Sequence, residues 1–458
     1  MELVLGIDLG TTNFKACVFD RDGAQRGLGR VAVQPETGHG SLFELPVDRF
    51  WKHLRQAIEQ GMRQAGAAAR DVRAMGYSSQ ASSFLLLDDR DRPLTPLVLW
   101  PDRRASQTDP KVEALWARPD FLRVTGLGVG PVGTSAPSKI RWFQKRRPEV
   151  WARARRVMTI SDYLVYCLTG QPVGDGGTAV LLGLMDLRAL EWWPTALEVL
   201  GIDGGKLSRP LRPGASAGPI TDEGAGRLGL GAGIPLAVGS LDHHMAAIGA
   251  GLDRLSKVSE STGTVTACIR HTDRFAPRPN CTCGPGLRSD QYYELAFDEN
   301  GAGVLDWYQR EHAPGLSIPE LLEIAEDVPA NGDRPVALPL ADRYPGLEGF
   351  TSRSPSHHHG HYVRAILDST AGSLAALIGC LYPRGGPGRI IATGGGARSD
   401  FWLQVHADRL GADIITVQCE EPACCGAAMV AATAAGWFAD CSEASASWVR
   451  PRKVFSPR

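Results

Sequence analysis

The sequence predicts an α/β fold with mixed β-sheets, divided into more than one domain. Strand-like runs alternate with helical runs along the chain, and some neighbouring strands are joined by tight turns of small residues. The chain has 458 residues, enough for roughly two to four domains of ~150 residues each. Hydrophobic residues make up 43% of it and charged residues 22%, which is ordinary for a globular protein with large cores.

The chain begins with a predicted β-hairpin and a helix. Residues 3–7 and 15–19 are strand-like, and the turn-rich residues 8–13 join them. Residues 47–65 follow as an amphipathic helix, because apolar side chains recur there at helical spacing. This order places a tight turn between two strands at the very start of the fold.

Two further strands and a short helix are expected before the middle of the chain. Residues 72–78 and 84–87 are strand-like, and residues 161–169 form the helix. Ser161 is a suitable N-cap for that helix, and Gly170 stands just past its end.

The second half repeats the alternation of helices and strands. Residues 363–378 carry an apolar helical stripe, and the buried strand 389–393 runs into three glycines. A helix at 400–410, a strand at 414–417 and an alanine-rich helix at 423–436 complete it. These elements, with the hairpins, are the basis for the α/β class.

Composition excludes several kinds of partner. Lys and Arg together number 49 and Asp and Glu 50, so no basic excess indicates nucleic acid binding. We find no uninterrupted apolar window of ~18 residues, so we expect no membrane span. Residues 1–5 lack the pattern of a signal peptide, and the ten cysteines lack zinc-site spacing. We therefore expect a cytoplasmic protein with reduced, buried thiols.

The first segment with a chemical signature is the turn at residues 8–15. Gly10, Thr11 and Thr12 could offer backbone and hydroxyl donors to phosphate, and Lys15 a positive charge. Asp8 could hold Mg²⁺, mainly through water. An ordinary hairpin turn is the alternative. No Walker A pattern is present, and two G-x-G-x-x-G matches, at 128–133 and 224–229, are expected to be loops.

The second segment, residues 237–244 (AVGSLDHH), ends a predicted strand with a carboxylate. Asp242 there suits a general base that accepts a hydroxyl proton during phosphoryl transfer. It equally suits an N-cap of the helix-compatible residues 245–251. The local sequence leaves both interpretations open.

Two glycine-containing turns lie in the second half. Residues 393–400 (TGGGARSD) connect a buried strand to a helix, where glycines could let a flat ring or a phosphate lie against the backbone. A flexible strand-to-helix turn is the alternative. Residues 260–264 (ESTGT) are loosely similar to residues 8–12 (DLGTT), since both are turns of small residues. Two phosphate-binding hairpins would show this similarity.

In this order, the motifs resemble those of the FGGY carbohydrate kinases, within the actin-like ATPase superfamily. Residues 6–12 (GIDLGTT) and 261–264 (STGT) resemble the two phosphate motifs of that family. Residues 239–242 resemble the segment with its catalytic aspartate, and residues 394–411 its adenosine motif. Residues 99–104 (LWPDRR) and 161–164 (SDYL) are similar to family segments as well. The resemblance covers nearly the whole chain.

The resemblance implies a fold and a set of roles. The fold would be two actin-like, ribonuclease H-like domains with mixed sheets around a cleft, spanning residues 1–244 (sugar and phosphate binding) and 245–458 (nucleotide binding). Asp242 would be the catalytic base and Asp8 the Mg²⁺ ligand. The residues implied to bind ATP are Thr11, Thr12, Lys15, Gly263, Thr264, Ala302, Gly303, Gly396, Ala397 and Asp400.

The implied activity is ATP-dependent phosphorylation of a small sugar or polyol. A xylulose-like ketose leads, and fuculose-like or ribulose-like sugars and polyols follow. Ala81-Ser82 matches neither the Arg-Glu pair of glycerol kinase nor the Met-His pair of xylulokinase. Gln80, Ser82, Asp102 and His243 are the candidate sugar residues, although Gln80 and Asp102 could equally stabilise loops.

Three further points stay open at this stage. A catalytically weak sugar- and nucleotide-binding regulator on the same fold is the alternative from another functional class. A homodimer is compatible with the resemblance. His357, His358, His359 and His361 suggest a metal site, but clustered histidines in a polar loop are more often simply solvated.

Overall fold

The computed structural model describes residues 1–38, 41–329 and 332–458. The chain divides into two compact units, and each is described by itself. Unit 1 contains Met1–Gly249, Thr272–Tyr293 and Glu421–Val449. Unit 2 contains Ala250–His271, Glu294–Glu420 and Arg450–Arg458. A segment near the end of the sequence, Glu421–Val449, is therefore part of the first unit.

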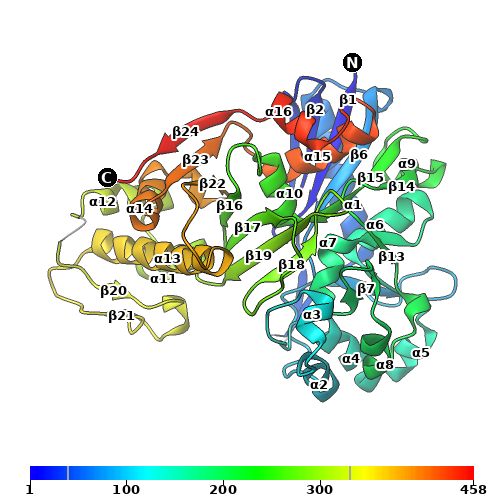
Figure 1. Cartoon of the computed structure of the whole chain (residues 1–458), viewed down its shortest axis with the longest axis horizontal. Helices are drawn as coiled ribbons and strands as arrows, with labels where there is room; N and C mark the ends of the chain where they lie inside the picture. The colour runs from blue at the N-terminus through cyan, green and yellow to red at the C-terminus, as the bar shows by residue number, and fades with distance from the viewer. Residues whose placement is uncertain (39–40, 330–331) are drawn as a thin grey trace. The chain divides into compact units, whose positions relative to one another are not determined.

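Unit 1 is built around a mixed six-stranded sheet (Figure 1). In sheet order its strands are β14 (Ser216–Pro219), β15 (Pro235–Leu241), β6 (Val72–Ser79), β1 (Leu3–Leu9), β2 (Asn13–Asp20) and β3 (Gln25–Ala32). β1, β6 and β15 run parallel, while β2, β3 and β14 pair antiparallel with their neighbours. The carboxyl ends of β1, β6 and β15 consequently meet at one edge of the sheet.

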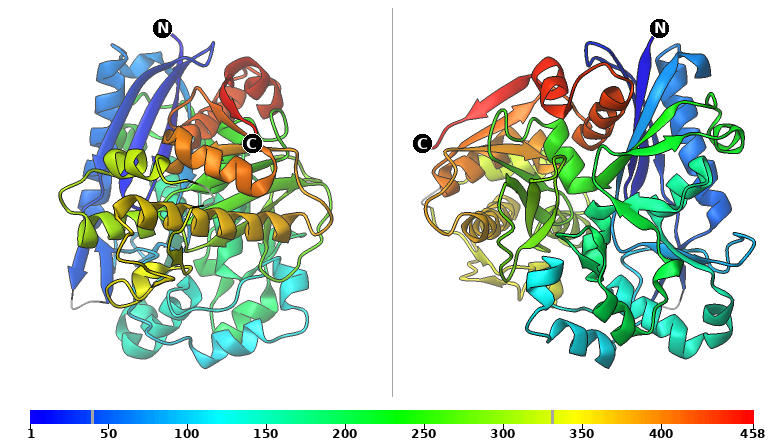
Figure 2. Two further views of the ribbon diagram at one scale, coloured as in Figure 1. Left: turned by 90° about the vertical axis from the view of Figure 1, so that its left-hand side faces the viewer. Right: turned by 45° about the vertical axis from the view of Figure 1, so that its right-hand side comes forward.

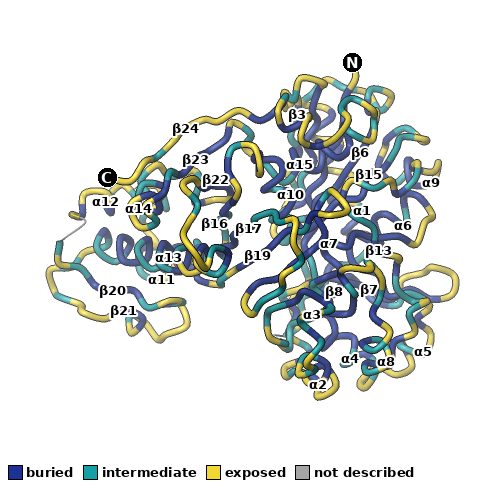
Figure 3. The backbone as a smooth tube through the Cα atoms, viewed as in Figure 1, coloured by how far each residue is buried: buried dark blue, intermediate teal, exposed yellow. Residues whose placement is uncertain are grey.

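β1 is buried along its whole length, as are most residues of the neighbouring strands β6 and β15 (Figure 3), because a helix layer covers each face of the sheet. Its leucines and Ile7 join the apolar cluster that contains Phe50 and Leu54 of helix α1 (Val47–Gln64). The opposite face meets α15 (Pro422–Ala434) so closely that a Cβ at Gly6 would lie 2.0 Å from the Cys424 carbonyl oxygen. Gly6 is therefore required for helix-to-sheet packing.

A second, five-stranded sheet of unit 1 supports the loops that follow β6. In sheet order its strands are β4 (Glu36–Gly38), β5 (Leu42–Leu45), β8 (Leu97–Val98), β7 (Phe84–Leu87) and β9 (Arg156–Thr159). Phe84, Leu86 and Val98 pack in one core with Ile140 and Phe143 of α4 (Ala136–Arg146).

The other elements of unit 1 are short. Its remaining strands are β10 (Val173–Asp175), β11 (Met185–Asp186), β12 (Glu191–Trp192), β13 (Arg209–Leu211) and β18 (Thr282–Pro285). Its remaining α-helices are α2 (Pro110–Trp116), α3 (Phe121–Thr125), α5 (Pro148–Arg153), α6 (Ile160–Thr169), α7 (Gly176–Ala179), α8 (Pro194–Leu200), α9 (Asp222–Leu228), α10 (Asp242–Gly249) and α16 (Cys441–Trp448). Single 3₁₀ turns are η1 (Ala69–Asp71), η2 (Val180–Leu182) and η3 (Gly204–Lys206).

Unit 2 also contains a mixed sheet. In sheet order its strands are β19 (Tyr292–Asp298), β17 (Thr266–Thr272), β16 (Val258–Thr262), β22 (Arg389–Thr393), β23 (Asp413–Val417) and β24 (Pro451–Phe455). Its other elements are α11 (Ala302–His312), α12 (Ile318–Glu326), α13 (His359–Leu381), α14 (Asp400–Leu410), β20 (Val336–Ala337), β21 (Phe350–Thr351), η4 (Ala341–Arg343) and η5 (Gly396–Arg398).

Helix α13 runs through the core of unit 2 and is seen lengthwise in the left view of Figure 2. It is the one helix among the described residues that is long and apolar enough to cross a membrane. Its apolar side chains, Val363, Ile366 and Leu367 among them, are instead completely buried in the core of unit 2. Its composition therefore reflects its place in that core.

The structure confirms the α/β class with mixed sheets, and it corrects two local predictions. The N-cap of α6 is Thr159, not Ser161, because the Thr159 hydroxyl accepts from the Asp162 N–H at 3.1 Å. Asp162 answers by accepting from the Thr159 N–H, which completes a capping box. Gly170 ends the helix in the left-handed conformation, as predicted. Residues 224–229 mostly belong to helix α9 and are not a loop.

Candidate functional site

The turn after β1 places Asp8 and Lys15 side by side. The two residues are partners in the antiparallel register of β1 and β2, so their side chains leave the same face of the sheet. Lys15 Nζ lies 3.3 Å from Asp8 Oδ2 and 2.8 Å from Glu421 Oε2. Glu421 also pairs with Arg30 of β3, so two cations hold it. The ammonium therefore stands between two carboxylates at the mouth of the turn.

These carboxylates keep Lys15 charged. Burial alone would lower the pKa of Lys15, but the charges of Asp8 and Glu421 outweigh it and raise the pKa above its ordinary value. A permanently positive side chain beside a turn of small residues is suited to phosphate.

Asp8 is buried at the carboxyl end of β1, with 5% of its surface exposed. Ser78 of the neighbouring strand β6 donates to Asp8 Oδ1 at 3.0 Å. Burial raises the pKa of Asp8, Lys15 opposes this, and the negative charge of Asp242 adds to it. The negative charge of Asp242 therefore acts on Asp8, which favours a cation near them.

Asp242 stands where β15 ends and α10 begins. In the parallel register Ser240 is opposite Ser78, and Ser78 is opposite Asp8, so Asp242 emerges at the same sheet edge as Asp8. Asp242 Oδ1 accepts from the adjacent N–H of His243 at 2.8 Å. A helix N-cap instead accepts from the second or third N–H of the helix, so this bond is not a capping bond.

A glycine allows β15 to reach that position. A Cβ at Gly239 would lie 1.8 Å from the backbone oxygen of Tyr77 on β6. The register of the two strands shifts between Ala237 and Ser240, around this glycine. The close approach of the strands thus fixes where Asp242 leaves the sheet.

The two threonines of the turn differ in their surroundings. Thr11 Oγ1 accepts from the indole N–H of Trp100 at 2.7 Å, and Trp100 itself is 40% exposed. The backbone oxygen of Thr12 accepts from the Val33 N–H at 2.8 Å, and its side chain is exposed. The turn is therefore tied on both sides while the Thr12 hydroxyl stays open to solvent.

Gln80 follows β6 directly and is buried. Its amide nitrogen donates to the carbonyl oxygens of Leu9 at 3.4 Å and Gly10 at 3.2 Å. Its amide oxygen accepts from the Ser83 hydroxyl at 2.8 Å. Gln80 thus stabilises the phosphate-type turn through hydrogen bonds to its backbone.

The other three candidate sugar residues occupy different environments. Ser82 is half-buried at a backbone φ of 57°, and His243 is half-buried next to Asp242. Asp102 is fully buried and accepts from Arg104 Nε at 2.8 Å and from the Phe43 N–H at 2.8 Å. Burial tends to raise the pKa of Asp102, but these hydrogen bonds prevail and hold it below its ordinary value. Asp102 therefore anchors its loop through Arg104.

Unit 2 contains a cavity of about 620 Å³. Residues from the predicted phosphate segment and from the predicted adenosine segment of this unit line it. Gly263, Thr264, Ala302 and Asp400, all predicted separately, line this one cavity. Its apolar wall consists of Leu305, Ile318, Leu322, Phe401 and Trp402. A flat aromatic ring fits such a wall.

The remaining predicted residues of unit 2 lie beside this cavity. Gly303 would place a Cβ 3.3 Å from the Thr264 oxygen, and Gly396 would place one 3.0 Å from Thr262 Cβ. Ala302 opens helix α11, and its N–H donates to the Gly263 oxygen at 2.7 Å. Ala397 lies in the adjoining turn η5. The hairpin turn and the N-terminus of α11 thus meet at one side of the cavity.

Trp402 was not predicted as a site residue. It lies in the wall of the cavity with 3% of its surface exposed, and its indole N–H has no hydrogen-bond partner within the described chain. A buried N–H costs free energy unless a ligand or a water accepts from it. Asp400, by contrast, is exposed and pairs with Lys453 of β24.

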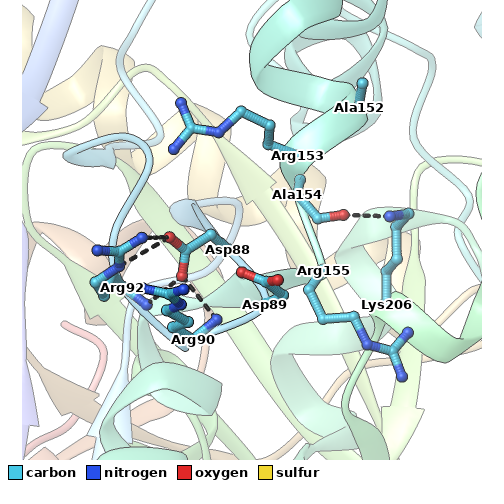
Figure 4. Close-up of a pocket in the computed structure, with 9 residues that line it drawn as sticks. All are labelled: Asp88, Asp89, Arg90, Arg92, Ala152, Arg153, Ala154, Arg155 and Lys206. Atoms are coloured by element: carbon cyan, nitrogen blue, oxygen red, sulfur yellow. Dashed lines mark hydrogen bonds and ion pairs between the residues drawn. The ribbon is translucent and has the colours of Figure 1, made fainter.

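A second hollow, in unit 1, has a different character (Figure 4). Asp88 accepts from Arg92, and Lys206 donates to the Ala154 oxygen. The guanidinium groups of Arg153 and Arg155 point away from each other in Figure 4. The charged groups at this hollow do not converge on a common point, so it is not a candidate site.

The histidine cluster has a local structural role. His358 accepts from the Gly360 N–H at 3.1 Å and caps helix α13, and His357 accepts from the Ser354 N–H at 3.0 Å. His359 contacts the Tyr308 hydroxyl at 3.0 Å. Within residues 1–38, 41–329 and 332–458 no group of three or more metal-ligating side chains converges. The cluster is hence neither a metal site nor simply solvated.

Lys139 and Glu421 were not predicted as site residues, and only the first of them has a recognisable sequence pattern. Lys139 falls on the buried face of α4 with Ala136, Ile140 and Phe143, a spacing visible in the sequence. Glu421 gave no such signal, because it reaches Lys15 from the far end of the chain.

Comparison with known proteins identifies the family of the chain. Residues 3–249 match the model of the N-terminal domain of the FGGY family of carbohydrate kinases. Residues 336–435 match the model of the C-terminal domain of that family.

Individual relatives span the whole chain. The chain is 26% identical over 469 residues to the xylulose kinase of Staphylococcus epidermidis, covering 100% of the chain and 92% of that protein. It is 28% identical over 473 residues to the L-xylulose/3-keto-L-gulonate kinase of Escherichia coli, covering 99% and 92%. The crystal structure of ligand-bound xylulose kinase from Lactobacillus acidophilus superposes with a TM-score of 0.88 at 23% identity, covering 100% and 94%. This last similarity shows a shared fold.

Proposed function

The chain belongs to the FGGY family of carbohydrate kinases, and from this premise we propose that it transfers the γ-phosphoryl group of ATP to a sugar hydroxyl activated by Asp242. Members of this family are sugar phosphotransferases that use ATP as a substrate. One observation carries the proposal most directly: Gly263, Thr264, Ala302 and Asp400 line one cavity in unit 2. Such a cavity supports nucleotide binding.

Asp242 is proposed as the general base. Its position at the edge where β1, β6 and β15 end is the usual place for ligand-binding residues of α/β sheets. A carboxylate there can accept the proton of a hydroxyl as that hydroxyl attacks phosphorus. Lys15 and the donors of the turn would stabilise the negative charge of the phosphoryl group.

Asp8 is proposed to hold Mg²⁺ through water. The residues fit this ion: Mg²⁺ usually takes one or two carboxylates together with phosphate oxygens and water. Burial raises the pKa of Asp8 and the negative charge of Asp242 adds to this, and a cation would offset that charge. When bound, Mg²⁺ would neutralise charge on the phosphates, while Ser78 and Lys15 orient Asp8.

The cavity of unit 2 is proposed to take the nucleotide. Phe401 and the neighbouring apolar side chains would cover the adenine ring. The hairpin turn at Gly263 and Thr264 and the start of α11 would lie beside the phosphates.

A neutral ketose such as xylulose is the lead substrate. Ribulose-like sugars, fuculose-like sugars and polyols are the alternative substrates. Of Gln80, Ser82, Asp102 and His243, none carries a fixed positive charge. The carboxylate of an acid sugar would require such a charge. His243, beside the base, is placed to hydrogen-bond a sugar hydroxyl.

A coupled assay of ADP release tests the proposal. Purified protein is incubated with ATP, Mg²⁺ and each member of a panel of ketoses, aldoses, polyols and aldonates. We expect a ketose to raise ADP release far above the sugar-free rate. If no member of the panel raises it, the protein is not a sugar kinase of this range and the regulator interpretation takes its place.

Two finer parts of the proposal are the compartment, which cell fractionation tests, and the oligomeric state, which sedimentation tests. We propose a cytoplasmic protein and a homodimer. Sedimentation equilibrium would give twice 49.2 kDa for the dimer, and 49.2 kDa would contradict it.

A further inference from the structure

Lys139 is a completely buried lysine in unit 1 whose charge serves no ion pair among the described residues. It lies on α4 with 0% of its surface exposed. Its ammonium donates to the backbone oxygen of Leu99 at 3.0 Å, of Ser82 at 3.3 Å and of Trp100 at 3.3 Å. The nearby carboxylate of Asp102 is paired with Arg104 instead. A lysine is rarely buried in this way without a partner of opposite charge.

Three donors meet three acceptors in this arrangement. A lysine ammonium has three N–H groups and no acceptor, and each of the three oxygens is a backbone carbonyl. The carbonyls come from two separate segments, one after β6 and one after β8. Lys139 therefore fastens two loops to each other and to helix α4.

Both loops belong to the proposed sugar and phosphate site. Ser82 is a candidate sugar residue, and its φ of 57° shows that its backbone is held in an uncommon conformation. Trp100 donates its indole N–H to Thr11, in the phosphate-type turn, at 2.7 Å. Its backbone N–H donates to the Ser83 hydroxyl at 2.9 Å, and that hydroxyl donates to Gln80.

We propose that Lys139 is a positioning residue for sugar binding, which holds the Ser82 and Trp100 loops in register with the phosphate-type turn. It contacts neither substrate nor nucleotide itself and acts through the carbonyls it binds. The inference rests on the proposed kinase function and concerns the sugar, not ATP. Loss of the ammonium therefore weakens sugar binding most, while the nucleotide cavity of unit 2 stays as it is and the phosphate-type turn keeps its bond from the Val33 N–H to Thr12.

The protonation of Lys139 gives this role a pH signature. The pKa of Lys139 is lowered to about 7. Burial is the main cause, the charge of Asp102 opposes it, and the charge of Arg104 adds to it. The neutral amine has two N–H groups and a lone pair, and that lone pair would face one of the three carbonyl oxygens. One contact is thus lost above about pH 7, and the two loops loosen.

The test compares Lys139→Met with Lys145→Met, the same substitution at an exposed lysine of the same helix. Sugar KM and ATP KM are measured for both variants and the wild type between pH 6 and pH 8.5. We expect Lys139→Met to raise the sugar KM roughly tenfold or more at pH 6, with ATP KM within about twofold of wild type. Lys145→Met leaves both constants unchanged.

The pH profile separates positioning from a merely structural role. In the wild type the sugar KM rises as pH increases through about 7, and in Lys139→Met this rise disappears. His243→Asn keeps the rise, which excludes a contribution from the histidine beside the base. If Lys139→Met does not fold, the wild type and His243→Asn carry the test alone.

Two results would overturn the inference while leaving the kinase function intact. One is an unchanged sugar KM in a folded Lys139→Met, and the other is a wild-type sugar KM that is flat from pH 6 to pH 8.5. Failure of the proposed function gives a different result, because no sugar then raises ADP release even in the wild type.

Discussion

Asp162 provides a quantitative test of the electrostatics of unit 1. It lies on α6 with 6% of its surface exposed, close to the fully buried Asp175. Burial raises the pKa of Asp162 from 3.8 to about 7, the charge of Asp175 adds to this, and hydrogen bonds from Thr159 oppose it. The fold therefore prefers the protonated, neutral form of Asp162.

The size of the effect follows from linkage between protonation and unfolding. Below pH 3.8 Asp162 is protonated in both the folded and the unfolded chain, so its stabilisation of the fold is complete there. This stabilisation is lost as pH rises through the folded-state pKa of about 7. At pH 5 the protonated Asp162 still contributes roughly 3 kcal/mol, and at pH 8 the contribution is close to zero. The substitution Asp162→Asn leaves an amide that is uncharged at either pH, and it therefore removes this slope.

The assay is thermal unfolding of the wild type and Asp162→Asn at pH 5, 6, 7 and 8. We expect Tm of the variant, relative to wild type, to increase between pH 5 and pH 8 by on the order of 5 °C. Asp222→Asn, on the exposed first turn of α9, serves as the control and keeps the wild-type slope. A difference between Asp162→Asn and wild type that does not change with pH would refute the argument.

Three further substitutions probe the site. Gly239→Ala would force a Cβ to within 1.8 Å of the Tyr77 oxygen and displace β15, so kcat should fall at least tenfold; unchanged kcat would show that the strands can separate freely. Glu421→Gln removes one of the two carboxylates beside Lys15, so kcat/KM for ATP should fall roughly tenfold, measured by ADP release; no change would mean that Asp8 alone positions this lysine. Phe401→Ala removes an aromatic ring from the cavity wall, so ATP KM should rise about threefold to tenfold; equal values for both proteins would exclude the proposed contact with adenine.

Local sequence patterns predicted the elements that form the site. The hairpin of β1 and β2, the strand β15 and the turn before α14 are each recognisable because turn residues interrupt runs of apolar side chains. Asp8, Lys15 and Asp242 stand next to these turns. Their positions could therefore be predicted within one segment, without knowledge of the rest of the fold.

Contacts between distant segments could not be predicted in this way. Glu421 reaches Lys15 only because α15 packs on β1, and Gly6 allows that packing through the absence of a side chain. The three acceptors of Lys139 come from two loops that approach each other only in the folded sheet. Such partners depend on tertiary packing, which periodicity does not encode.

Errors in local prediction had a similar origin. Thr159 and Ser161 are both suitable N-caps by residue type, and the choice falls on Thr159 because strand β9 ends there. The glycines at 224 and 229 suggested a loop, yet Gly224 packs against the backbone of Leu168, and Thr221 caps the helix.

The most direct test of the kinase proposal is the rate of ADP release by Asp242→Asn with the best sugar of the panel. Asparagine keeps the size of the side chain but cannot accept the hydroxyl proton as a carboxylate does. We expect kcat to fall by roughly 10²–10⁴-fold, with ATP KM and Tm close to wild type. A variant that retains wild-type kcat would contradict the assignment of Asp242 as the general base.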